Sequence, residues 1–474
     1  MTRNKTIDMT TGSIFKKLII FALPLIATNL LQVLFNLADV AVLGIFVPDP
    51  ILADNTVAAV GSNTPLINLI IALFVGLSLG SNVVIAKYIG QRDKEKIDRG
   101  VGSSLFIALS GSLILMVVGF FGARTFLIWM SCNKEIIDLA EKYLKIYFLG
   151  MPAIMLYNFS AAILRADGDT FHPMLFITIG GVINVILNIL FVACFNMYVE
   201  GVAIATVASQ LFASIACLIV LFKNKGNVKF NIKHLRFYKE QVADIFKIGV
   251  PSGVQSAMFS ISNVIIQTAI NKFSPAIITA NTIAVHIDNI IFFVGYGFAM
   301  ATLSFVGQNL GACKFDRLKK VPFVASLWIL MVSTSMSALV VIFSRQICGI
   351  LTETEEVIRQ AQIKIYILSP TYFLCALMQI YENTIKGLGK AFISMVISIL
   401  CTCVFRVVYI DIALKYLGIT PIALKVIYWV YPISWFIPAV IEFVIMLYLF
   451  KKLPKTDKED SPNQNLQQAQ GEKA

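Results

Sequence analysis

Polar side chains at helical spacing in the first apolar segment are the clearest sign of chemistry in this sequence. The stripe consists of Asn29, Gln32, Asn36 and Asp39, which are spaced three, four and three residues apart. This spacing places them on one face of a helix. Amides alone are typical of helix–helix contacts in a membrane. A carboxylate is costly there unless it faces protein or water, so Asp39 indicates a functional site.

Two later segments supply partners for Asp39. Asn184 and Asn188 are four residues apart, and Thr206 lies in the next apolar segment. Counting about 1.5 Å per residue from the predicted loops, these side chains lie at the same depth as Asp39, in the outer half of the membrane. Their oxygens could hold Na⁺, a hard cation, or could surround an Asp39 that takes up a proton. We expect no cofactor, and no metal other than Na⁺ at Asp39 if sodium is the coupling ion.

A second polar stripe lies in segment 244–271 and consists of Ser256, Ser260, Asn263, Gln267 and Asn271. When the two segments are aligned on Pro24 and Pro251, Asn36 matches Asn263. Asp39 falls on the apolar Ile266. The polar face is therefore shared between the two segments and the acid is not. We expect the coupling site to lie in the first half of the chain only.

Charged and amide side chains in the second half are candidates for a substrate cavity. Glu382 and Arg406 could form a salt bridge across the bundle or could bind cargo. Gln379 shares a helical face with Glu382, and Asp288 lies in another apolar segment. We expect the cavity to be lined from both halves, by Gln32, Asn36, Asn263, Gln267, Asp288, Gln379, Glu382 and Arg406.

The composition shows what must position these residues. Hydrophobic residues make up 58% of the 474 residues and charged residues only 14%, against roughly 25% charged in a soluble domain. Most apolar stretches exceed the roughly 18 residues that mark a membrane helix, and spanning segments are helical by default. We predict an all-α membrane protein with twelve spans, at 18–46, 57–85, 101–122, 139–164, 173–195, 201–222, 244–271, 277–305, 321–343, 360–385, 391–414 and 422–450.

The net charge of +12 is concentrated in alternate loops. Basic residues gather at 16–17, 87–99, 223–239, 314–320 and 451–455, whereas the other loops are acidic or mixed. This is the positive-inside pattern, and it predicts a multi-pass protein of the cell (inner) membrane with both termini cytoplasmic. The charge therefore needs no nucleic-acid partner. We expect a monomer whose partners are the bilayer and small organic solutes.

The two halves repeat one another. Tyr88–Gln91 resembles Phe305–Gln308, and three further matches follow the same order: Pro24 with Pro251, Lys145–Tyr147 with Lys364–Tyr366, and Leu164–Gly168 with Ile385–Gly389. Parallel repeats of this kind hold substrate between two lobes that rock against each other. We therefore expect a cytoplasmic N-terminus (1–16), an N-lobe (17–222), a cytoplasmic linker (223–243), a C-lobe (244–453), each lobe with six spans, and a disordered cytoplasmic tail (454–474).

An ordered set of motifs resembles the multidrug and toxic compound extrusion (MATE) family over nearly the whole chain. The set consists of Pro24 with Asn36 and Asp39, Gly90-Gln91, Arg165–Thr170, Gly201–Thr206, Gly307–Ala312 and Lys386–Gly389. The resemblance implies a V of two six-helix lobes that exports organic, cationic or amphipathic drugs and toxins in exchange for H⁺ or Na⁺ by alternating access. It also implies that Asp39 is the coupling acid and that Asn184 and Thr206 belong to its cation site. Asn188 stands where some members have a second Asp.

Two other functions fit the sequence less well than antiport. A flippase for a lipid-linked precursor would need a large basic central cavity, and Arg406 is the main cavity-suited basic residue evident in the spans. An enzyme would need clustered His, Ser or Cys residues, and the three His residues are scattered. Neither is favoured, and we predict that the protein is not an enzyme.

Overall fold

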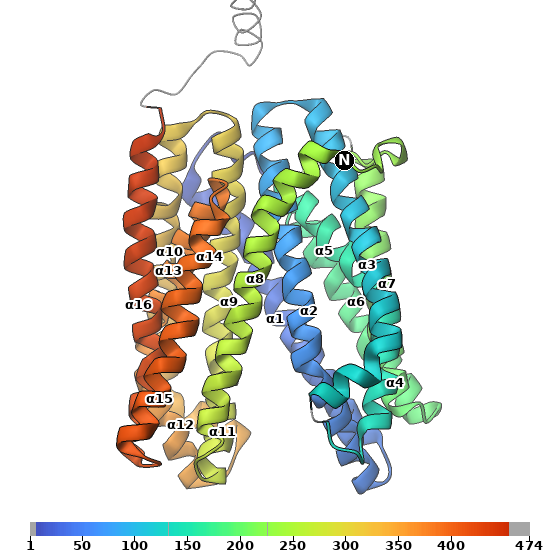
Figure 1. Ribbon diagram of the computed structural model, residues 1–474, viewed down its shortest axis with the longest axis vertical. Helices are drawn as coiled ribbons and strands as arrows, with labels where there is room; N and C mark the ends of the chain where they lie inside the picture. The colour runs from blue at the N-terminus through green and yellow to red at the C-terminus, as the bar shows by residue number, and fades with distance from the viewer. Residues whose placement is uncertain (1–5, 131, 225, 455–474) are drawn as a thin grey trace, which may run out of the picture.

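The computed structural model describes residues 6–130, 132–224 and 226–454, so the predicted tail lies outside the described residues except for Pro454. Within these residues the regular secondary structure is helical throughout. Ten helices are long and apolar enough to cross a membrane, and a bent pair of helices makes an eleventh span. A less apolar helix of 32 residues completes twelve passes in two lobes, which Figure 1 shows side by side.

The first lobe, the N-lobe, contains α1 (Ile14–Phe46), α2 (Pro50–Gln91), α3 (Lys94–Trp129), α4 (Ile137–Leu149), α5 (Met151–Ala166), α6 (Phe171–Ile189), the π-helix η1 (Leu190–Cys194) and α7 (Tyr198–Lys223). The short 3-10 helix η2 (Ile232–His234) lies in the connection. The C-lobe contains α8 (Lys239–Ile270), α9 (Pro275–Gly311), α10 (Phe315–Ile342), α11 (Ser344–Leu351), α12 (Glu355–Leu368), the 3-10 helix η3 (Ser369–Thr371), α13 (Tyr372–Gly387), α14 (Ala391–Ser398), the π-helix η4 (Ile399–Val404), α15 (Phe405–Leu417) and α16 (Pro421–Lys452).

Irregular segments fall at matching places in the two lobes. The fourth pass, predicted as one span at 139–164, bends by 48° between α4 and α5, because Pro152 cannot donate a backbone hydrogen bond to the preceding turn. The tenth pass is interrupted by η3, which contains Pro370. The fifth and eleventh passes each contain a π-helical turn, η1 and η4. The predicted repeat is thus present even in the helix defects.

Backbone conformations also repeat, and they correct the predicted alignment of one motif. Arg92, after α2, and Cys313, after α9, both have positive φ values, 56° and 54°. Gly168 and Gly389 are a second such pair, with φ values of 97° and 77°. The helix ends therefore align Gly90 with Gly311. The sequence match with Gly307 is displaced by one helical turn, because glycines recur at that spacing along α9.

Glycines bring the lobes into contact at one end of the bundle, which we call the basic end. It is the end at which both described termini lie (Figure 1), and it carries Lys94, Lys314, Lys320 and Lys451. A Cβ atom added to Gly76 of α2 would lie 2.1 Å from the backbone nitrogen of Gly253 in α8. One added to Gly90 would lie 2.1 Å from the carbonyl oxygen of Gln308 in α9. No side chain fits between these helices.

The lobes separate toward the opposite end, which we call the distal end. Figure 1 shows the ribbons of the two lobes diverging in that direction. Asn36 of α1 and its repeat counterpart Asn263 of α8 are both exposed. The close approaches between the lobes therefore lie toward the basic end, and Asn36 and Asn263 are among the exposed residues of α1 and α8.

The N-terminal strap, residues 7–12, packs across both lobes at the basic end. Its Ile7 amide donates to the carbonyl of Gly168 in the N-lobe at 3.1 Å. On the C-lobe side, Asn309 and Arg317 donate to the carbonyl of Met9 at 3.1 and 3.0 Å. The Met9 side chain is fully buried. The predicted N-terminus 1–16 therefore includes a structural element that joins the lobes.

We expect Arg317→Ala to free the strap. Besides Met9, Arg317 donates to the carbonyls of Thr11 and Gly12 at 2.8 and 2.6 Å. Hydrogen bonds to charged groups contribute roughly 1.5–3 kcal/mol, so amide hydrogen exchange of the strap should rise about tenfold or more. Mass spectrometry of the protein in nanodiscs measures this. Arg345→Ala, which removes an exposed ion pair with Glu355, is the matched control; equal exchange in both variants would contradict the prediction.

The connection between the lobes is packed on the N-lobe rather than extended. Val228 is fully buried, and Lys94 donates to the carbonyl of Asn227 at 2.9 Å. Asn227 and Asn224 donate to the two carboxylate oxygens of Asp167 at 2.9 and 3.3 Å. Burial raises the pKa of Asp167 to about 6, although these two amides favour the ionised form. The linker thereby covers the loop that follows α5.

Candidate functional site

The side chains of Asp39, Asn184, Asn188 and Thr206 form one cluster. The Asn188 amide donates to the Asp39 carboxylate at 2.5 Å and to Asn184 Oδ1 at 3.3 Å. Asn184 donates to Thr206 Oγ1 at 3.4 Å. Both asparagines are buried, whereas Asp39 is half-buried. The structure therefore brings together the four residues that were predicted from three separate segments.

Two adjacent glycines of α6 explain why the cluster forms. A Cβ atom on Gly181 would lie 1.8 Å from the ring of Phe35, so α1 packs against α6 one turn before Asp39. A Cβ atom on Gly180 would lie 3.0 Å from the carbonyl oxygen of Ser209 in α7. These close approaches set the register of α1 and α7 on α6.

A π-helical turn follows the cluster directly. The π-helix η1 begins at Leu190, so only Ile189 separates it from Asn188. The extra residue in a π turn widens the helix, and such turns are frequent at functional sites. Asn188 is therefore held at the junction between regular and widened helix, where its amide donates to Asp39.

The donor set of the cluster fits a small hard cation or a proton. Asn188 Oδ1 is buried and accepts no hydrogen bond from any of the described residues. Rotating this amide by half a turn would place its oxygen, in place of its NH₂ group, next to Asp39. The orientation of an amide follows from its hydrogen-bond partners, so a cation bound at Asp39 would favour the rotated form. Within the described chain no three His, Cys, Asp or Glu side chains gather into a metal site, so an ion here would be held by one carboxylate and neutral oxygens.

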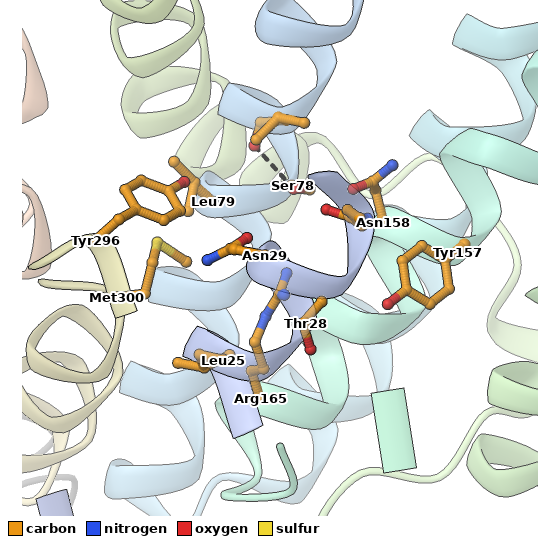
Figure 2. Close-up of a pocket in the computed structure, with 12 residues that line it drawn as sticks. Leu25, Thr28, Asn29, Ser78, Leu79, Tyr157, Asn158, Arg165, Tyr296 and Met300 are labelled. Atoms are coloured by element: carbon orange, nitrogen blue, oxygen red, sulfur yellow. Dashed lines mark hydrogen bonds between the residues drawn. The ribbon is translucent and has the colours of Figure 1, made fainter. Parts of the chain in front are cut away.

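A pocket of about 120 Å³ lies where the N-lobe meets α9 of the C-lobe. Figure 2 shows Arg165 reaching from α5 toward Asn29 in the middle of this pocket. Its walls are formed by Leu25, Thr28, Asn29, Gln32, Val75, Ser78, Leu79, Tyr157, Asn158, Arg165, Tyr296 and Met300. We call it the central pocket. Gln32 is the one predicted cavity residue among those that line it.

The other predicted cavity residues lie outside the central pocket. Asn36 is exposed on α1, and Gln379 is buried on α13. A chain of polar contacts leads from Gln267 to Asp288. Asn281 donates to Gln267, Lys364 donates to Asn281, and Lys364 also pairs with Asp288. The structure does not bring these residues into one cavity.

The pairing of Glu382 with Arg406 that the sequence suggested is wrong. Glu382 forms an ion pair with Lys386, one turn away on α13. Arg406 instead donates to Asn263 at 3.0 Å and to Ser434 at 2.9 Å. Neighbours at i and i+4 meet on any helix, whereas a contact across the bundle depends on how the helices pack.

Sequence reasoning missed two basic residues inside the bundle, the buried Lys364 and the half-buried Arg165. Lys364 is 1% exposed and lies 3.6 Å from Asp288. Arg165 lines the central pocket. Both residues belong to repeat motifs of the sequence. Lys364 matches Lys145, and Arg165 matches Lys386 at the equivalent helix end, so a basic residue at both positions of each match was a signal that could have identified them. Arg165 must therefore be added to Arg406 among the few basic residues of the spans that suit a cavity.

Comparison with known proteins agrees with this architecture. A family model described as MatE matches residues 24–190 and 251–410. The "Probable multidrug resistance protein YoeA" of Bacillus subtilis (strain 168) is 26% identical over 395 residues, covering 82% of this chain and 84% of that protein. The "Multidrug export protein MepA" of Staphylococcus aureus (strain NCTC 8325 / PS 47) is 22% identical over 379 residues, covering 80% and 82%.

The fold is shared with solved structures. One, described as the "Outward-facing conformation of a multidrug resistance MATE family transporter of the MOP superfamily", superimposes with a TM-score of 0.87 at 24% identity, over 96% of this chain and all of that one. At this identity the likeness concerns the fold alone. The family match covers most of both lobes, and the chain therefore belongs to the MatE family of multi-pass membrane transporters.

Proposed function

We propose that the protein is a secondary active antiporter that exports organic, cationic or amphipathic drugs and toxins in exchange for H⁺ or Na⁺ by alternating access. The observation that carries the proposal is the Asp39 cluster, in which the polar partners of a carboxylate in α1 are, among the described residues, neutral. Its repeat counterpart, Ile266, is apolar and fully buried. The relatives named for multidrug resistance and export support the cargo class.

Exchange requires that the ion bind the two states of the transporter unequally. Asp39, Asn184, Asn188 and Thr206 would hold the ion. Pro24 lies in α1, where the missing backbone donor lets the helix bend. A change of charge at Asp39 would alter how α1 packs against α6 and would thereby shift the balance between states.

The orientation follows from the positive-inside rule. We infer that the basic end faces the cytoplasm and that both termini are cytoplasmic, in the cell membrane. The lobes are in contact at the basic end and apart at the distal end, so the described state faces outward. In this state Asn36 and the half-buried Asp39 are accessible from outside.

Transport by the purified protein in proteoliposomes tests the proposal. Rhodamine 123, an amphipathic cationic dye, should move against its own gradient when a proton or Na⁺ gradient is imposed separately. Movement with one ion alone identifies the coupling ion. Dye that moves only down its own gradient under both conditions would contradict antiport. The alternative of a flippase for a lipid-linked precursor is not favoured, because the similar proteins are named for multidrug resistance and export.

A further inference from the structure

Arg165 is a half-buried cation that lines the central pocket, and no described residue forms a hydrogen bond or an ion pair with it. Its Nε atom is buried, and among the described residues none forms a hydrogen bond with it. None of the described side chains that line the pocket is acidic. Glu382, which also lies near Tyr296, is already paired with Lys386. Among the residues that the structure describes, the guanidinium therefore has no free counter-charge.

An unpaired arginine is expensive at this depth. A buried charge costs several kcal/mol unless it is paired and hydrogen-bonded, and arginine cannot relieve the cost by losing its proton. Arg406 is fully buried and also has no acidic partner among the described residues, but it donates to Asn263 and Ser434 and lies over the rings of Phe259 and Tyr431. Arg165 differs because it faces a pocket.

The rest of the pocket can receive one end of an amphipathic molecule. Asn29 presents an amide beside Arg165 (Figure 2), Gln32 lines the same pocket, and Tyr296 adds a hydroxyl from the other lobe. Leu79 and Met300 supply apolar walls. A planar guanidinium binds a carboxylate through two parallel hydrogen bonds. Amides beside it can donate to the same oxygens.

We propose that the central pocket binds the carboxylate of an amphipathic cargo, with Arg165 as its counter-charge. This rests on the proposed transport function and refines its cargo class. Cargo then includes zwitterions, in which a cationic frame carries a carboxylate. Because Tyr296 and Met300 belong to the C-lobe, the bound carboxylate contacts both lobes. Its affinity therefore depends on the relative position of the lobes.

Two dyes that differ by one methyl group test the proposal. Rhodamine 110 has a free carboxylate, and rhodamine 123 is its methyl ester. Binding is measured by fluorescence anisotropy with wild-type protein and Arg165→Gln in nanodiscs of phosphatidylcholine. Loss of a charge-assisted contact should weaken binding of rhodamine 110 about tenfold to hundredfold. Arg165→Lys, which keeps the charge but not the paired donors, should show an intermediate loss.

The controls separate this role from a structural one. Arg124→Gln removes an exposed arginine that pairs with Asp138 and Glu141, and it should leave the affinity for both dyes unchanged. If Arg165→Gln weakens both dyes equally, or neither, the carboxylate site is wrong. If rhodamine 110 is displaced as phosphatidylglycerol replaces phosphatidylcholine, a lipid headgroup occupies the pocket and the cargo assignment is wrong. Failure of ion-driven export by wild type would instead contradict the proposed function.

Discussion

Ion-driven export is expected to fall about 5- to 150-fold in Asp39→Asn, because coupling free energies between two binding sites typically lie near 1–3 kcal/mol. Asparagine keeps the shape of the side chain and a hydrogen-bonding partner for Asn188. It removes the charge that lets H⁺ or Na⁺ bind the two states unequally. Initial rates of rhodamine 123 export from proteoliposomes, with the ion gradient imposed, measure the effect.

Asp54→Asn is the matched control for this experiment. Asp54 is an exposed carboxylate near the start of α2, and it takes no part in the Asp39 cluster. Its replacement should leave the export rate near that of wild type. Asp39→Asn that still drives the dye against its gradient would remove Asp39 from the mechanism, while the twelve-helix fold would stand.

Gly76→Leu is expected to open the contact between the lobes at the basic end. Its Cβ atom would lie 2.1 and 2.3 Å from the backbone N and Cα atoms of Gly253, which cannot rotate away. Overpacking costs about 1–3 kcal/mol, and the cost applies only to the state closed at this end. The ratio of closed to open states should therefore fall about 5- to 150-fold.

Spin labels at Lys94 and Lys320, both exposed and one on each lobe, report this change by double electron–electron resonance in a cysteine-depleted background. Longer distances should gain population in Gly76→Leu. Gly61→Leu is the control on the same helix, because a Cβ atom at Gly61 has no neighbour within 4 Å. Identical distance distributions in the two variants would show that glycine packing does not hold the basic end closed.

Much of the architecture was determined by local sequence. The length and apolarity of the segments predicted the spans, because a membrane helix must satisfy its backbone internally over a fixed thickness. The four residues around Asp39 could also be predicted, since helical spacing and depth depend only on position along the chain. Pro152 and Pro370 lie in the two interrupted passes, although neither the 48° bend after α4 nor the 3-10 turn η3 was anticipated.

Only the tertiary structure decided which buried charges meet. Glu382 pairs within its own helix and not with Arg406, and Arg165 faces a pocket formed partly by the other lobe. The N-terminal strap joins residues about 300 positions apart in the chain, such as Met9 and Asn309. Such contacts depend on how closely two helices approach each other. Glycines such as Gly76 and Gly181 permit the close approaches, but the sequence alone does not show which helix packs against them.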